Sequence, residues 1–243
     1  MIERIKLDIL AVGVHPDDVE LSCSGTLLRQ IAYGNIVGIL DLSRGELGSR
    51  GSAEIRDIES RKAQLMMGAA IRENAGMEDG FFEHNEINIR KIIKVIRKYR
   101  PEIVLANALD DRHPDHGRAA KLTADACFLS GLRKIETIGD DGIQQEAWRP
   151  RFLYHYMQDR SLKPDFVVDI TPFSEKKMEL IMAYSSQFYN PQSGEPETPI
   201  SDMNFLQSVQ AKDRVFGRLL GVEFAEAFNA SRTVGIRDLF DLQ

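Results

Sequence analysis

The segment that decides the fold is Ala11-Val12-Gly13-Val14-His15-Pro16-Asp17-Asp18-Val19-Glu20, in which an apolar run ends in a histidine, a proline and two acids. A second segment repeats this composition, because Ile103-Val104-Leu105-Ala106 leads into Asp110-Asp111-Arg112-His113-Pro114-Asp115-His116. Short apolar runs of this kind are typical of buried parallel strands. A single His-Pro pair would more simply be a turn with a solvated histidine. The matched pair instead predicts that both segments contribute to one site.

The two segments hold three of the five histidines of the chain. Two histidines and one carboxylate, with a position left open, are a common ligand set for catalytic zinc and also suit Fe(II). We therefore expect a metal held by His15, His116 and one of Asp17 and Asp18, and the spacing leaves open which acid it is. The other acid can accept a proton from water as the water attacks a carbonyl group. His113 is expected to stabilise the oxyanion or to protonate the departing amine.

The composition indicates a soluble globular protein of ordinary type. At 243 residues, with 43% hydrophobic and 28% charged residues, we expect a single domain over residues 1–243. The net charge of −6 argues against a nucleic-acid partner. Two cysteines make no disulfide framework and fit a reducing cytosol. No apolar run approaches the length of a membrane span, and Met1–Lys6 lacks a signal-peptide core, so we expect a cytoplasmic protein with no membrane partner.

The order of the expected elements predicts an α/β fold, a Rossmann-like three-layer sandwich with a mostly parallel central sheet. Strand, helix and strand are expected at 5–14, 25–32 and 36–42, which is a right-handed βαβ unit. Further helices are expected at 52–67, 87–99, 115–129, 176–188 and 205–220, and further strands at 69–71, 103–106, 152–157 and 166–170. In the helix at 52–67, Ile55, Ile58, Leu65 and Met66 are expected to form the inward stripe. The pattern after residue 221 does not assign the segment to a helix or a strand.

Two loops are expected near the site. The loop at 43–52 holds three glycines and follows a strand end, where ligands bind in doubly wound sheets. It does not match a phosphate-binding glycine fingerprint, so a dinucleotide is not expected. The loop at 190–199 holds three prolines, and it either covers the site or joins two elements.

The paired His-Pro-Asp motifs, together with Arg44-Gly45-Glu46-Leu47-Gly48 and the downstream Arg56, resemble the LmbE-like, or PIG-L, family of zinc-dependent N-acetylglucosaminide deacetylases. The resemblance implies that zinc is held by His15, Asp18 and His116. It also implies that Asp17 is the general base and that His113 stabilises the tetrahedral intermediate. Family members often form homo-oligomers, hexamers included.

Within this family, the segments Asp110 to His116 and Tyr154-His155-Tyr156-Met157-Gln158 are most similar to the members that deacetylate N-acetyl-alpha-D-glucosaminyl L-malate in bacillithiol biosynthesis. A malate group calls for guanidinium partners, since arginine binds carboxylates through paired hydrogen bonds. Arg56 and Arg112 are therefore the expected substrate-binding residues.

Other functions remain open at this stage. The substrate could be a different N-acetylglucosamine derivative, such as a chitin disaccharide. The chain could also be a metal-binding or sugar-binding module without catalysis, although a pure binder has no need of a base beside its ligands. An Fe(II) oxygenase uses the same ligand set but usually has a β-rich scaffold.

Overall fold

The structure is a computed structural model that describes residues 5–241. The expectation about a signal peptide falls largely on residues 1–4, which lie outside the described residues. The strands are β1 (Ile9–Gly13), β2 (Val37–Asp41), β3 (Ile71–Asn74), β4 (Ile103–Ala106), β5 (Phe152–Tyr156), β6 (Phe166–Asp169) and β7 (Ala225–Ala230). The helices are α1 (Asp18–Ser22), α2 (Ser24–Ala32), α3 (Ala53–Met67), α4 (Glu86–Tyr99), α5 (Pro114–Leu129), α6 (Ser174–Ile181) and α7 (Met203–Leu220), with short 3-10 turns at Thr171–Phe173 and Leu239–Asp241.

One seven-stranded sheet organises the described chain, in the order β3-β2-β1-β4-β5-β7-β6. The first five strands of this order are parallel, and β7 is antiparallel to both of its neighbours. All five residues of β1 are buried, as expected for a central strand covered on both faces. The α/β fold class with a mostly parallel sheet is confirmed.

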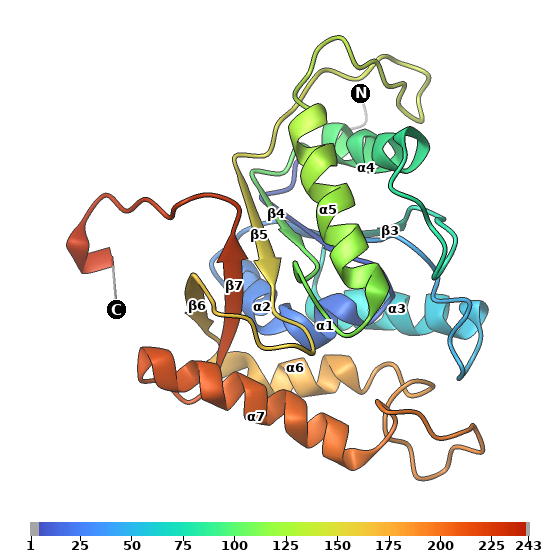
Figure 1. The fold of residues 1–243 in the computed structure, drawn as a ribbon, viewed down its shortest axis with the longest axis vertical. Helices are drawn as coiled ribbons and strands as arrows, with labels where there is room; N and C mark the ends of the chain where they lie inside the picture. The colour runs from blue at the N-terminus through green and yellow to red at the C-terminus, as the bar shows by residue number, and fades with distance from the viewer. Residues whose placement is uncertain (1–4, 242–243) are drawn as a thin grey trace.

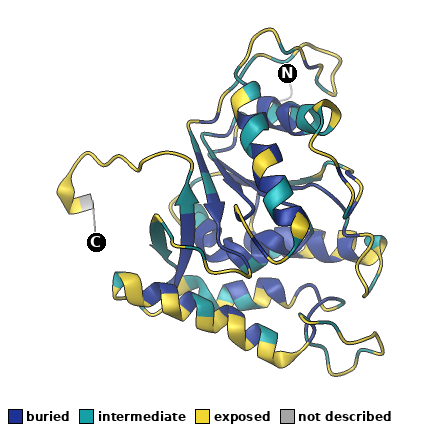
Figure 2. Cartoon of the chain, viewed as in Figure 1, coloured by how far each residue is buried: buried dark blue, intermediate teal, exposed yellow. Residues whose placement is uncertain are grey.

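Helices cover both faces of this sheet (Figure 1). On one face, Leu10 and Val12 of β1 pack against apolar residues of α4 and α5. On the other face, Ile9 and Ala11 pack against residues of α1, α2 and α6. The helix α7 lies beyond α6 and presents an exposed outer side, whereas the central strands are buried (Figure 2). Neighbouring residues of β1 thus contribute to two separate cores.

The helix α3 has the opposite orientation from the one predicted. Ile58 and Leu65 are 70% and 68% exposed, and Ile55 is also exposed. The buried face instead carries polar residues, including Arg56 and Glu59. The prediction of an inward stripe is therefore wrong for Ile55, Ile58 and Leu65, whereas Met66 is partly buried and packs against the apolar core as predicted. The buried side of α3 combines Ala63 and Met67, which belong to apolar cores, with polar residues that bond near the site.

The helix α6 also ends earlier than predicted, at Ile181 rather than Phe188. The chain leaves the helix because the segment that follows bonds to α3. Ser186 donates from its backbone N–H to Glu59 Oε1 at 2.8 Å and from its hydroxyl to Glu59 Oε2 at 2.6 Å. Residues 182–188 accordingly form turns rather than a continuation of the helix.

A buried ion cluster joins the C-terminal elements to the rest of the fold. Lys177 Nζ of α6 lies 2.6 Å from Asp213 Oδ2 of α7 and 2.9 Å from Glu226 Oε1 of β7. Glu226 also accepts hydrogen bonds from the backbone N–H groups of Gly25 and Thr26 in α2. The Lys177 side chain is 1% exposed, so its charge depends on these two carboxylates.

We predict that Lys177→Met lowers the free energy of unfolding by about 3–5 kcal/mol, because the two carboxylates would stay buried without their cation. The neighbouring Lys176→Met is the matched control. Lys176 makes an exposed pair with Glu179, so this substitution should cost about 1 kcal/mol or less. Urea unfolding of both variants measures the difference. Equal midpoints for the two variants would show that the cluster does not stabilise the fold.

Candidate metal and catalytic site

The two histidine segments meet because their strands are neighbours. β1 pairs with β4 in parallel, with Ile9 opposite Ile103, so both strands end at the same edge of the sheet. The order of the sheet reverses between these two strands, since β2 lies on the other side of β1. Ligands bind at such a reversal in open α/β sheets. A cavity of about 730 Å³ lies there, lined by residues of both segments.

Three of the predicted residues form a group that could hold a metal ion. One ligand atom each of His15, Asp18 and His116 lie within 4.8 Å of one another. His116 Nε2 is 3.2 Å from Asp18 Oδ1, and His15 Nδ1 is 3.8 Å from Asp18 Oδ2. Two imidazoles and one carboxylate suit a divalent transition metal. The structure therefore brings together the three predicted ligands.

Each of the two histidines is oriented by a second carboxylate. His116 Nδ1 lies 2.5 Å from Asp111 Oδ2, and His15 Nε2 lies 2.9 Å from Asp79 Oδ1. In each ring one nitrogen contacts this carboxylate while the other faces Asp18. This is the usual arrangement around metal-binding histidines, because the outer carboxylate fixes the tautomer and makes the ring more basic. The donor set and its surroundings thus fit a cation.

The electrostatics of the group also favour positive charge. Burial opposes protonation of His116, but Asp18 and Asp111 raise the pKa of the ring to about 10. Burial would raise the pKa of Asp18, yet His116 and His15 hold it well below its usual range. These opposite shifts indicate a position where a cation lowers the free energy of the ionised carboxylates.

Asp17 lies beside the group and has unusual backbone geometry. Its φ is 134°, in a region that residues other than glycine rarely adopt. The residue is 5% exposed and lines the cavity. Burial raises the pKa of Asp17 to about 7, with Arg56 acting against this shift and Asp18 adding to it. Strain held at a buried acid is typical of a functional position.

His113 precedes α5 as its N-cap and lines the same cavity. Its Nδ1 accepts a hydrogen bond from the backbone N–H of Asp115 at 3.3 Å, which leaves Nε2 as the protonated nitrogen of a neutral ring. Burial, together with His15 and His116, lowers the pKa of His113. The imidazole is therefore set to act as a neutral hydrogen-bond donor.

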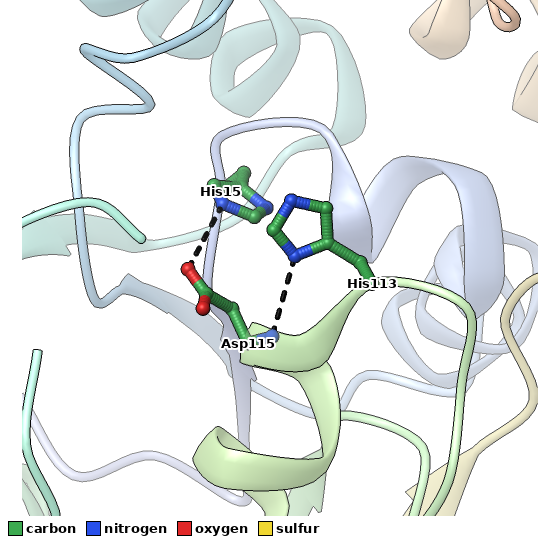
Figure 3. Close-up of side chains that lie close together, drawn as sticks. All are labelled: His15, His113 and Asp115. Atoms are coloured by element: carbon green, nitrogen blue, oxygen red, sulfur yellow. Dashed lines mark hydrogen bonds and ion pairs between the residues drawn. The ribbon is translucent and has the colours of Figure 1, made fainter. Parts of the chain in front are cut away.

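A second group that could hold a metal ion shares His15 and combines it with His113 and Asp115. Figure 3 shows these three residues, with the His15 and His113 rings side by side. Asp115 already lies 3.1 Å from the Arg118 guanidinium and accepts a bond from the Gly80 N–H. An arginine at this distance disfavours a metal cation. The group with Asp18 is thus the better candidate.

Arg56 is buried at 6% exposure and lines the cavity together with Asp17. It donates to Gln187 Oε1, and its Nε has no hydrogen-bond partner among the described residues. The loop at 43–52, which we call the glycine loop, passes close to this guanidinium. A Cβ added at Gly45 would lie 2.2 Å from Arg56 Nη1, and a Cβ added at Gly48 would lie 2.9 Å from Arg56 Nη2. Glycine is therefore needed where the loop crosses Arg56.

Arg112 lies at the rim of the cavity, and its side chain is 55% exposed. Its Nε is 2.7 Å from Asp159 Oδ2, so the guanidinium is paired on one side.

The loop at 190–199 also reaches the cavity, which Thr198 and Pro199 help to line. Arg50 holds this loop through the carbonyl of Pro196 and the hydroxyl of Ser193.

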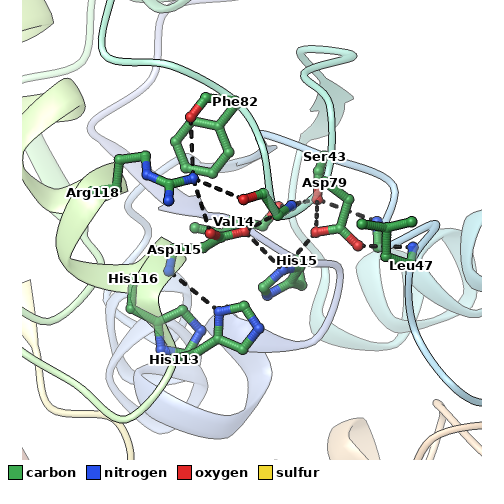
Figure 4. Close-up of polar contacts among 12 residues, drawn as sticks. Val14, His15, Ser43, Leu47, Asp79, Phe82, His113, Asp115, His116 and Arg118 are labelled. Carbon is green, nitrogen blue, oxygen red and sulfur yellow. Dashed lines mark hydrogen bonds and ion pairs between the residues drawn. The ribbon is translucent and has the colours of Figure 1, made fainter.

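Four polar residues of the site had no role in the sequence prediction: Asp79, Asn107, Asp111 and Gln158. Asp79 also accepts a hydrogen bond from the Leu47 N–H, so it links the glycine loop to His15 (Figure 4). Asn107 and Gln158 donate amide hydrogen bonds to Asp18. Asp111 and Gln158 could have been found from their positions in the motif segments. Asp79 and Asn107 stand in segments without a local signal.

The chain matches the family model of PIG-L, GlcNAc-PI de-N-acetylase, over residues 10–127, which contain all of the predicted site residues. The diacetylchitobiose deacetylase of Thermococcus kodakarensis (strain ATCC BAA-918 / JCM 12380 / KOD1) is 26% identical over 193 residues, covering 74% of this chain and 70% of that protein. The uncharacterized deacetylase YaiS of Escherichia coli (strain K12) is 30% identical over 126 residues, covering 49% of this chain and 67% of that protein.

Among solved structures, the conserved protein TT1542 from Thermus thermophilus matches with a TM-score of 0.83 and 35% identity, over 96% of this chain and 98% of that chain. Within residues 5–241, no helix is both long enough and apolar enough to cross a membrane. The motifs, the fold and these relatives agree, and the chain belongs to the PIG-L (GlcNAc-PI de-N-acetylase) family of deacetylases.

Proposed function

We propose that the protein is a zinc-dependent N-deacetylase that hydrolyses the acetamide of an N-acetylglucosamine conjugate. The observation that carries this proposal is the group of His15, Asp18 and His116 beside the buried carboxylate of Asp17, all lining one cavity. Family membership supports deacetylation as the reaction. The donor set suits zinc, and Fe(II) accepts the same ligands, so availability in the cell decides the metal.

The residues divide the reaction between them. Asp17 accepts a proton from the attacking water as a bond forms between that water and the acetamide carbonyl carbon. His113 donates a hydrogen bond from Nε2 to the oxyanion that develops. The C–N bond then breaks, the proton passes to the amine nitrogen, and acetate leaves. A divalent cation, when bound, supplies polarisation of the carbonyl and makes water more acidic.

For the substrate we propose N-acetyl-alpha-D-glucosaminyl L-malate, the precursor in bacillithiol biosynthesis. Support comes from the two arginines of the cavity, since Arg56 has an unpaired Nε and Arg112 stands at the rim. Both could bind carboxylates of the malate group. The alternative is a chitin disaccharide, which the relative from Thermococcus kodakarensis favours. A module that binds a metal or sugar without catalysis is the remaining alternative.

The proposal also covers the cellular location, the partners and the oligomeric state of the enzyme. We place it in the cytoplasm, where the substrate is a small molecule and neither a nucleic acid nor a membrane is a partner. We also propose that it acts as a homo-oligomer, with the hexamer as one candidate, on the basis of the family resemblance.

Replacement of the proposed base should separate catalysis from metal binding. We expect Asp17→Asn to keep the metal and to lower turnover by about 10²–10⁴-fold, the usual contribution of a general base. Asparagine has nearly the same shape as aspartate, so the substitution adds no further strain to the backbone at this position. Acetate release and metal content are measured on the same sample. Asp17→Gly serves as the control for backbone strain, and near-normal turnover in Asp17→Asn would refute the assigned role.

The metal ligands are tested by metal content. We expect His116→Ala to lose the bound metal, because the three-ligand group cannot hold it with one imidazole removed. His84→Ala is the matched control, since His84 is an exposed histidine that pairs with Asp125. Elemental analysis of both purified variants gives metal per chain and also identifies the metal. If His116→Ala retained one metal per chain, another group of residues would hold it.

The substrate is tested by acetate release from the malate conjugate and from diacetylchitobiose. We expect Arg112→Met to raise KM for the malate conjugate by about 10–100-fold, the size of one or two charge-assisted hydrogen bonds. The KM for the neutral disaccharide should change little. Arg160→Met is the control, because Arg160 is similarly exposed and is also paired with an aspartate, but it is not among the residues that line the cavity. A wild-type preference for the disaccharide would overturn the malate assignment and leave the reaction intact.

A further inference from the structure

The outer face of α3 exposes three large aliphatic side chains at regular spacing. Ile55, Ile58 and Leu65 are 43%, 70% and 68% exposed. They occupy positions i, i+3 and i+10, and Lys62 fills the i+7 position between them. This is the a/d spacing of a coiled-coil seam, which places all four side chains on one narrow stripe.

This stripe has no role inside the chain. The opposite face of α3 makes the intramolecular contacts, through residues such as Ala63, Gln64 and Met67. An isoleucine or leucine side chain is more stable buried than in contact with water. A group of exposed aliphatic side chains on one helix face is therefore a candidate interaction surface.

The charges along the stripe identify the partner. The N-terminal half of the exposed face carries Glu54 and Asp57, and the C-terminal half carries Arg61 and Lys62. Arg44 pairs with both acids and leaves that half with one net negative charge. Neither basic residue of the other half has a carboxylate partner within ion-pair distance among residues 5–241. The face is therefore acidic at one end and basic at the other.

A face with this charge order is complementary to an antiparallel copy of itself. A twofold axis near residue 60 would place Ile55 of one copy against Leu65 of the other. It would also bring the acidic half of each helix next to the basic half of its partner. A parallel arrangement would instead set like charges against each other. We propose that the exposed face of α3 is the contact between two copies of this chain, paired antiparallel about a twofold axis.

The inference rests on the proposed homo-oligomer and adds the surface that forms it. It does not depend on the reaction, because the exposed stripe lies on the side of α3 away from Arg56 and the cavity. Failure of the deacetylation proposal would leave it unchanged.

The first arm of the experiment measures the particle mass of the wild-type chain by sedimentation velocity over a wide concentration range. We expect a particle of at least two chains. A wild-type chain that stays monomeric up to its solubility limit would overturn the proposed homo-oligomer and, with it, this interface.

The second arm uses Ile58→Glu and Leu65→Glu. We expect each to raise the dissociation constant by about 100-fold or more, because a twofold interface contains every substitution twice. The control is Leu219→Glu, which changes a residue of α7 with a similar exposure of 64%. Unfolding midpoints confirm that the variants are folded, since exposed substitutions cost little within one chain. If both α3 variants kept the particle mass of the wild-type oligomer, the protein would still be an oligomer but α3 would not be its interface.

The third arm tests the antiparallel arrangement with two charge variants. Glu54→Lys/Asp57→Lys makes the whole face basic, and Arg61→Glu/Lys62→Glu makes it acidic. Each should be impaired alone, because both ends of the pair then carry like charges. An equimolar mixture should recover the wild-type mass, since opposite charges meet at both ends. If the mixture stayed dissociated, the antiparallel pairing would be wrong.

Discussion

The carboxylate of Asp18 joins the ends of three strands, and the geometry of the site depends on it. Its Oδ2 accepts hydrogen bonds from the backbone N–H groups of Val14 and His15, just beyond β1. The same oxygen accepts from Asn107 after β4, and Oδ1 accepts from Gln158 after β5. A carboxylate held by four donors has little freedom to rotate, so the sheet itself sets its position. His116 then approaches Oδ1 from α5.

This arrangement concentrates negative charge where water is largely excluded. Asp17 and Asp18 are adjacent and both buried, and Asp79 and Asp111 stand behind the two histidines. Burying like charges together is costly unless a cation or a proton compensates them. In the structure the compensation comes from raised histidine pKa values and from a raised pKa of Asp17. A divalent cation would provide the same compensation with two charges at one point.

Most of the parallel core and the central ligands could be predicted from the sequence, because their signals are local. The apolar run at Ile9–Gly13 and the following His15 stand within a few residues of each other. The rule that ligands lie at the carboxyl ends of strands then places the second motif beside the first. Asp79 gave no such signal, since its role depends on a loop folding back 64 residues from His15. The strand β7 was missed for a similar reason, because Glu226 weakens the apolar pattern of its segment and the Lys177 that pairs with it lies far away in the chain.

The helix α3 shows how the chemistry of a site can reverse the usual rule of burial. Three aliphatic residues of this helix lie on one side of it, but periodicity does not say which side points inward. Arg56 enters the cavity and Glu59 holds the turn at Ser186, so the side that carries them is the inner one. The three aliphatic residues are then left on the outer side, among charged residues. A helix that supplies a buried arginine to a site thereby exposes aliphatic side chains, and these are the surface that we propose for assembly.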